Sequence, residues 1–193
     1  MRTAISELFA AALTAALLSN AVFSQGLGIT EAIRLSAKRS RLLSAAAFVT
    51  LFSLLCTVGV QLLTPFFPGA EGNAFFRLTL CAAVLCAAYL TVLAALRTLR
   101  ADDAVLRRAR VAALNTLVLG VPYLTGANGR TLWGAVGTAL GAGAAFILAM
   151  ALLGAGAKKL GENERMPAVF RGSASLLIYA GILALAFAGV GGT

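Results

Sequence analysis

Six apolar segments, separated by short loops that carry most of the charge, restrict what this chain can fold into. They span residues 4–23, 42–64, 74–96, 108–125, 131–154 and 168–190. Hydrophobic residues make up 60% of the chain and charged residues only 12%, about half the charged share of a typical soluble domain. A bilayer accommodates this much apolar surface, whereas a soluble core does not. The sequence therefore predicts an all-α integral membrane protein with six transmembrane helices and a single membrane domain over residues 1–193.

The distribution of basic residues predicts how the chain is oriented. Thirteen of the sixteen Lys and Arg residues fall in the first, third and fifth loops, at 24–41, 97–110 and 155–171. Loops on the cytoplasmic side carry an excess of Lys and Arg, so we expect these loops to be cytoplasmic and both termini to be outside. Because the net charge of +9 is explained by topology, we expect no nucleic-acid partner. Arg2 and Glu7 cancel before the first apolar segment, so we do not expect that segment to be cleaved as a signal peptide.

Two of the six segments are poorly suited to a simple crossing. The run 111–125 has only 15 residues and contains Asn115 and Gly120, and the run 8–23 has 16 residues with Asn20 near its end. A membrane-spanning helix needs roughly 20 apolar residues. A pair of short, interrupted segments in corresponding positions of two halves indicates a functional site near the midplane between inverted repeats. We therefore expect the first helix of each half to be short or broken near the midplane.

The number of segments agrees with such a repeat. Three spans per half is an odd number, so the second half enters the membrane from the side opposite to the first. The repeats would cover approximately residues 1–99 and 104–193. Similarity between the halves is confined to the surroundings of Asn20 and Asn115, which lie 95 positions apart, and a coincidental pair of asparagines is the alternative explanation.

Few side chains inside the apolar segments are suited to chemistry. No acidic or basic residue lies deep within a segment, which argues against proton-coupled transport by this chain alone. The chain has no histidine, and its cysteines, Cys56, Cys81 and Cys86, lie within apolar segments, where such residues usually pack as small hydrophobic groups. We therefore expect no catalytic residue and no metal-ligand cluster.

The two asparagines have a structural interpretation and a functional one. An asparagine in apolar surroundings is unfavourable by several kcal/mol unless it is hydrogen-bonded. We expect Asn20 and Asn115 to bind the backbone groups that are freed where the two helices break. Contact with an ion or a cofactor is the alternative.

Glycines in the fifth segment predict close helix packing. Gly137 and Gly141 have the GxxxG spacing that lets the backbones of two membrane helices approach each other. We interpret this motif, and the glycines of the last segment, as packing features.

Several stretches together resemble one family of membrane subunits. They are Asn20-Ala21-Val22 with Leu27-Gly28, then Asn115-Thr116-Leu117-Val118-Leu119-Gly120-Val121, and the C-terminal stretch from Pro167-Ala168-Val169-Phe170-Arg171-Gly172-Ser173 through Ala180-Gly181 and Leu185-Ala186-Phe187-Ala188-Gly189. In these motifs, its length and its six segments, the chain resembles the membrane subunits of the Rnf and Nqr ion-translocating electron transport complexes, in particular the Rnf A subunit, which is similar to the Nqr E subunit.

The resemblance implies a subunit of a membrane oxidoreductase and ion translocase of the bacterial cytoplasmic (inner) membrane, not catalytic alone. Such a subunit pairs with a homologous, oppositely oriented subunit, and other subunits carry flavin and iron–sulfur centres. The family pair holds a two-iron two-sulfur cluster near the midplane, with one cysteine from each break of each subunit. Electron passage through the cluster is coupled to movement of Na⁺ or H⁺.

This sequence departs from the family at both cysteine positions, which are Thr30 and Thr116 here. Because thiolates hold iron–sulfur clusters, we expect this chain not to bind the cluster in the family's mode. Its residues of interest are Asn20, Gly28, Thr30, Asn115, Thr116 and Gly120.

Two other functions are compatible with the size and topology of the chain. One is the six-helix, substrate-binding membrane component of a small-molecule uptake transporter. The other is a structural scaffold subunit that transports nothing.

Overall fold

The computed structural model describes residues 2–36, 42–67, 69–127, 131–162, 167 and 172–191, and these residues form helices joined by short turns without any strand. The helical elements are α1 (Arg2–Leu13) with its π-helical continuation η1 (Thr14–Leu18), α2 (Ala21–Ser24), α3 (Ile29–Ser36), α4 (Leu42–Leu63) with the 3₁₀ turn η3 (Thr64–Phe66), α5 (Gly69–Gly72), α6 (Ala74–Thr98), α7 (Asp103–Ala113), α8 (Thr116–Ala127), α9 (Leu132–Gly161) and α10 (Ser173–Gly191).

The helices confirm an all-α membrane protein. Within the described residues, α4, α6 and α9 are long and apolar enough to cross a bilayer. Three shorter apolar helices accompany them, at Thr3–Leu18, Thr116–Gly126 and Ala174–Gly189. The short helices are the first, fourth and sixth of the predicted segments, and the first and fourth are the two that the sequence predicted to be short.

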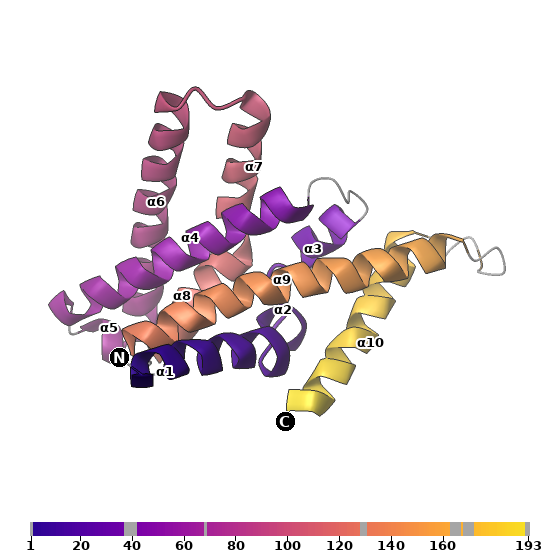
Figure 1. Ribbon diagram of the computed structural model, residues 1–193, viewed down its shortest axis with the longest axis horizontal. Coiled ribbons are helices and arrows are strands. Elements are labelled where there is room, and N and C mark those ends of the chain that lie inside the picture. Colours follow the sequence, from indigo (N-terminus) through magenta and orange to yellow (C-terminus); the bar gives the residue numbers. More distant parts are fainter. Residues whose placement is uncertain are drawn as a thin grey trace.

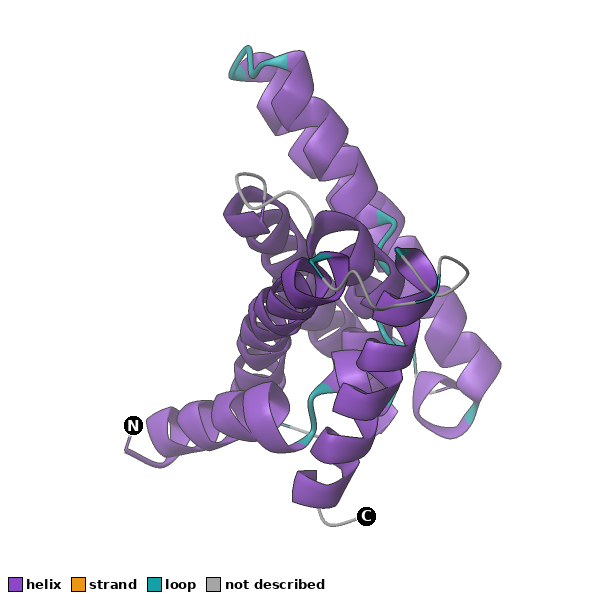
Figure 2. Cartoon of the chain, turned by 90° about the vertical axis from the view of Figure 1, so that its right-hand side faces the viewer, coloured by secondary structure: helices purple, strands orange, loops and turns teal. Residues whose placement is uncertain are grey.

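The long helix α9 is the centre of the packing. It lies beside α4 and α1, and α8, α10 and the short helices α2 and α3 also contact it (Figure 1). The core contains large side chains from α4, α8 and α9, among them Phe52, Leu117, Phe146, Met150 and Leu153, which are almost fully buried. The pair α6 and α7 projects from this body, as two views at right angles show (Figure 2).

Glycines of α9 allow α1 to approach closely. A Cβ atom at Gly137 would overlap the carbonyl oxygen of Leu8, and one at Gly141 would overlap the carbonyl oxygen of Ala12. Both contacts are to the backbone of α1, which cannot move aside as a flexible side chain could. The GxxxG pair is therefore a packing motif, as its spacing predicted.

Two stretches predicted as loops are largely helical. The first loop, 24–41, contains α3, and the third loop, 97–110, contains the end of α6 and most of α7. The fourth segment thus begins at Asp103 and not at 108. Helix α7 buries Leu106, Ala109 and Ala112, whereas Arg107 and Arg110 are exposed. The arginines between the apolar residues obscured their helical spacing in the sequence.

Smaller corrections apply to two other loops. The second loop, 65–73, contains part of η3 and all of α5. Helix α9 continues to Gly161, so Lys158 and Lys159 lie in its last turn and not in a loop. The fifth segment is therefore longer than its apolar part, because charged side chains at a helix end reach solvent without ending the helix.

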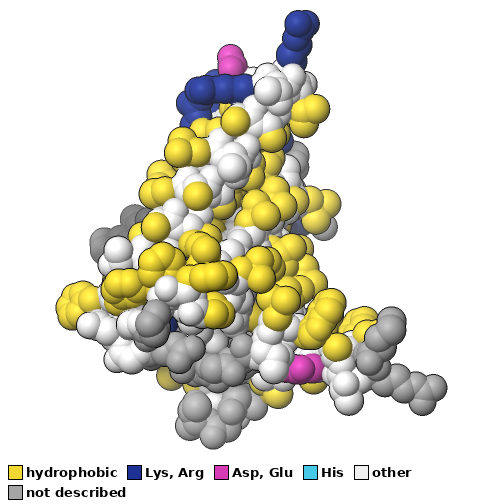
Figure 3. Space-filling model, turned by 90° about the vertical axis from the view of Figure 1, so that its left-hand side faces the viewer, with side chains coloured by type: hydrophobic (Ala, Val, Ile, Leu, Met, Phe, Trp, Pro, Cys, Tyr) yellow, Lys and Arg dark blue, Asp and Glu magenta, His cyan; other side chains and the backbone are white. Residues whose placement is uncertain are grey.

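One group of charged side chains lies at the end of the α6–α7 pair. Figure 3 shows Lys and Arg side chains gathered at the end where α6 and α7 meet, above a face covered by hydrophobic side chains. Five of the residues used for the orientation (Lys38, Arg39, Arg41, Arg165 and Arg171) and residues 168–171 of the C-terminal motif lie outside the described residues.

Replacing Gly141 by Ala should destabilise the protein. The new methyl group would overlap the α1 backbone at Ala12, and overpacking of this kind is unfavourable by about 1–3 kcal/mol. We expect a lower thermal unfolding midpoint for the purified protein in detergent. Gly181→Ala on α10 is the matched control, because nothing lies within 4 Å of a Cβ atom there. Equal midpoints for the two variants would contradict the close approach of α1 and α9.

Candidate functional site

The first helix break is held by the side chain of Asn20. The π-helical turn η1 ends at Leu18, and α2 starts immediately after Asn20. The Asn20 Oδ1 atom accepts hydrogen bonds from the N–H groups of Val22 (3.1 Å) and Phe23 (3.4 Å), and its Nδ2 donates to the carbonyl oxygen of Ala16 at 3.2 Å. One fully buried side chain therefore binds backbone groups on both sides of the break.

The second break uses the same residue type in the same way. Helix α7 ends at Ala113, and α8 begins after Asn115. The Oδ1 atom of Asn115 accepts a hydrogen bond from the N–H of Leu117 at 2.9 Å. The expectation that both asparagines bind freed backbone groups is confirmed. Unlike the Asn20 amide, the buried Nδ2 of Asn115 has no hydrogen-bond partner within the described protein.

The two breaks contact each other. The N–H of Gly28 donates a hydrogen bond of 2.9 Å to Oγ1 of Thr116, a residue 88 positions away. Gly28 has a φ of +74°, and a Cβ atom there would lie 2.7 Å from Oδ1 of Asn115. Leu27 packs on Gly120 so closely that a Cβ atom at Gly120 would lie 2.5 Å from its Cδ1. We call these four residues (Leu27, Gly28, Thr116 and Gly120), together with Asn115, the break junction.

The structure brings most of the predicted site residues to this junction. Gly28, Asn115, Thr116 and Gly120 are in it, and Thr30 follows in the first turn of α3. Thr30 and Thr116 are both exposed on the surface of the isolated chain. Asn20 makes its contacts within its own break, at the start of α2.

Helix α2 links the first break to the last helix of the chain. The ring of Phe23 stacks on the ring of Phe187 in α10, with the centroids 4.9 Å apart. Since α10 also contacts α9, this stack fixes the short helix α2 between two longer ones.

The polar side chains of the break junction are the amide of Asn115 and the hydroxyl of Thr116. Such groups donate and accept hydrogen bonds but supply no thiolate. The three cysteines are elsewhere, Cys56 in α4 and Cys81 and Cys86 in α6. No group of three or more His, Cys, Asp or Glu residues is close enough to hold a metal ion in the part of the chain that the structure describes.

Two further buried hydroxyls were not singled out from the sequence. Ser53 and Thr57 lie one turn apart on α4, are fully buried, and have no hydrogen-bond partner among the described residues. Their spacing of four residues in an otherwise apolar span was the available signal. Helix α4 packs against both α8 and α9, so these hydroxyls lie in the interior of the helical body.

Taken together, the apolar helices and the two asparagine-capped breaks define a multi-pass membrane protein with interrupted helices that meet inside it. The sequence matches the family described as Rnf-Nqr subunit, membrane protein, over residues 8–193, and the chain belongs to this family. No curated protein matches the sequence. Family membership makes the chain a membrane subunit of an Rnf/Nqr-type electron transport complex, as the resemblance implied.

Replacing Gly28 by Ala should destabilise the break junction more than the same change at Gly26. Both glycines have positive φ, +69° at Gly26 and +74° at Gly28, so both variants carry a backbone strain of about 1–2 kcal/mol. Only at Gly28 does the new methyl group also meet the Asn115 side chain, whereas nothing lies within 4 Å at Gly26. In detergent, the thermal unfolding midpoint should therefore be highest for the unchanged protein, lower for Gly26→Ala and lowest for Gly28→Ala. A lower midpoint for Gly26→Ala than for Gly28→Ala would contradict the close contact of Gly28 with Asn115.

Proposed function

We propose that this chain is a non-catalytic membrane subunit of a redox-driven, ion-translocating complex of the bacterial inner membrane, and that it holds no iron–sulfur cluster of its own. It would pair with a homologous, oppositely oriented subunit, as the resemblance to the Rnf A and Nqr E subunits implies. Flavin and iron–sulfur centres would be carried by other subunits. The contribution of this chain would be to shape and close the membrane part of the complex.

One observation supports the proposal: the hydroxyl of Thr116, which the resemblance places at a ligand position of the family's cluster, accepts a hydrogen bond from the N–H of Gly28. The second ligand position is Thr30, also a hydroxyl. These residues do not fit a cluster that requires thiolates. Cys56 and Cys81 are buried in α4 and α6, away from the two break segments in the sequence, and offer no obvious replacement.

The packing of the helices supports the inverted repeat within this proposal. If α1–α3, α4 and α6 correspond to α7–α8, α9 and α10, several contacts between the two halves have a symmetric counterpart. The contact of α1 with α9 corresponds to that of α7 with α4, and the contact of α3 with α9 corresponds to that of α8 with α4. The contact of α2 with α10 corresponds to that of α8 with α6. The Phe23–Phe187 stack joins α2 to α10, and the cation–π contact of Arg77 with Tyr123, at 5.7 Å, joins α6 to α8.

The uptake-transporter alternative has no observation in its favour, because the family match covers nearly the whole chain. A scaffold without any link to transport differs from our proposal only in its partners. Purification of the complex therefore distinguishes the two.

Substituting Thr30 should leave the iron content of the complex unchanged. The complex would be purified through a tag on this chain, and Thr30→Val removes the hydroxyl at an exposed position. We expect redox subunits to co-purify and the iron per complex and the paramagnetic resonance spectrum to equal those of the unchanged complex. Thr116→Val is the second variant, and its effect should be limited to stability. A loss of iron in Thr30→Val, or purification without any redox subunit, would refute the proposal.

The proposed orientation can be tested with reporter fusions. Alkaline phosphatase fused after Thr193 should be active and a green fluorescent reporter there dark, because the positive-inside rule places the C-terminus outside. The matched control is insertion in the turn between α6 and α7, next to Arg100, where we expect the opposite result. The same reporter signal at both sites would contradict the six-span topology.

A further inference from the structure

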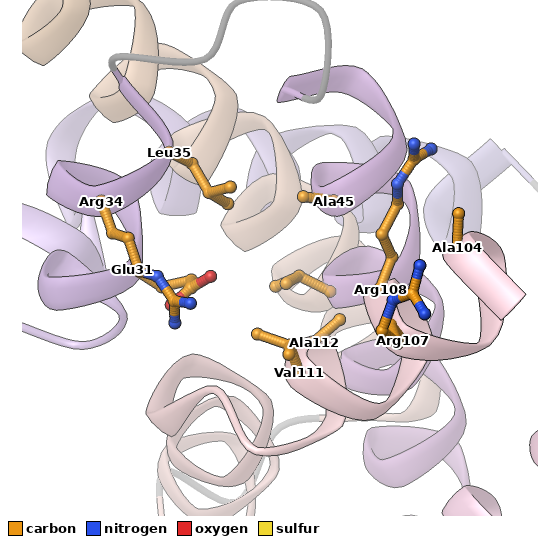
Figure 4. A pocket seen from close by; sticks show the side chains of 10 residues that line it. Glu31, Arg34, Leu35, Ala45, Ala104, Arg107, Arg108, Val111 and Ala112 are labelled. Carbon is orange, nitrogen blue, oxygen red and sulfur yellow. The ribbon is translucent and has the colours of Figure 1, made fainter.

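A pocket of about 290 Å³ lies between α3, α4 and α7. Its charged residues come from two walls that face each other: Glu31 and Arg34 belong to α3, and Arg107 and Arg108 to α7 (Figure 4). Between them the lining is apolar and small, with Ala45 and Val49 of α4 and Ala112 of α7. The sequence analysis used these arginines only to orient the chain.

The charges of the pocket favour an anion. Three guanidinium groups face one carboxylate, that of Glu31, which pairs with Arg34 at 3.7 Å. Arg108 donates to the hydroxyl of Ser44 at 3.2 Å. Arg107 has no carboxylate partner among the described residues. The planar fork of arginine matches the geometry of a phosphate group, so a phosphate between the walls would relieve the repulsion between Arg34 and the two arginines of α7.

The depth of the pocket favours a ligand that is also apolar. Helix α4 is one of the long membrane-spanning candidates, and its span begins at Leu43. The bond from Arg108 to Ser44 places the charged rim at the beginning of that span. Val49 lies four residues after Ala45, or about 6 Å further along the helix. The pocket thus passes from charged to apolar within one helical turn, which is the profile of a lipid from headgroup to acyl chain.

We propose that this pocket binds an anionic phospholipid, with the phosphate held by Arg34, Arg107 and Arg108 and the start of an acyl chain against Val49 and Ala112. Basic pockets between transmembrane helices on the cytoplasmic side are suited to such headgroups. Glycerol phosphate offers the same charged group without the apolar part, so it separates a lipid site from a site for a soluble phosphate.

The position of the pocket gives the lipid a structural role. Glu31 follows Thr30 directly, and Ala112 precedes Asn115 by three residues. A phosphate that bridges α3 and α7 would therefore connect the two segments next to the break junction. This role does not depend on the redox partners, so the lipid experiment and the iron experiment can fail independently.

The experiment compares anionic and zwitterionic lipids on the delipidated full chain in detergent. Phosphatidylglycerol, phosphatidylcholine with the same acyl chains, and glycerol phosphate are titrated, while thermal unfolding and native mass spectrometry report binding. We expect phosphatidylglycerol to bind and to raise the unfolding midpoint, and the other two compounds to have little effect. Because each arginine near anionic lipid contributes about 1 kcal/mol, Arg34→Gln and Arg107→Gln should each weaken binding about fivefold.

Arg110→Gln is the matched control, since Arg110 lies on α7 and is exposed but does not line the pocket. It removes the same charge and should bind phosphatidylglycerol as the unchanged chain does. Arg34→Gln should not disturb folding, because 72% of the Arg34 side chain is exposed. Weaker binding by this variant therefore reports on the pocket and not on a folding defect. The proposal is overturned if both pocket variants bind phosphatidylglycerol as tightly as the control variant does. It is also overturned if phosphatidylcholine or glycerol phosphate raises the unfolding midpoint as much as phosphatidylglycerol does.

Discussion

The break junction depends on one constraint: the hydrocarbon of a bilayer offers no hydrogen bonds to an open backbone. A helix that stops inside the membrane leaves N–H and C=O groups without partners. Asn20 and Asn115 bind such groups from within their own breaks, and Thr116 accepts a further N–H from the opposite break, that of Gly28. The two interruptions therefore stabilise each other. Because α3 starts directly after Gly28 and α8 starts at Thr116, this contact also fixes the start of α3 beside the start of α8.

The same hydrogen bond bears on our proposal that Thr116 stands at a position where the family has a ligand cysteine. A hydroxyl is a good acceptor for a backbone N–H, whereas a thiol is a weak one. The hydroxyl of Thr116 connects the second break to the first by a direct hydrogen bond between protein atoms. Under this proposal, threonine in place of cysteine would remove a means of holding a cluster and supply a means of closing the junction.

The features that the sequence predicts well are those that the bilayer enforces. Apolar composition predicted the membrane helices, and the cost of a buried amide predicted the roles of Asn20 and Asn115. Helices α3 and α7 were missed because their exposed faces are charged, so that Arg107 and Arg108 suggested a loop although Leu106, Ala109 and Ala112 have helical spacing. The contact of Gly28 with Thr116 spans 88 residues, and no local pattern encodes the partner of such a bond.

The two helices that were missed are also the walls of the arginine-lined pocket, and both results have the same physical origin. A membrane protein needs basic residues at its cytoplasmic ends for orientation, and these residues must lie on surfaces that the apolar helices do not bury. Where two such surfaces face each other across the start of a span, as α3 and α7 do at α4, their charges repel unless an anion lies between them. The lipid that surrounds the protein supplies that anion. Arginines of the kind that orient membrane proteins can therefore also hold the two interrupted segments of this chain together.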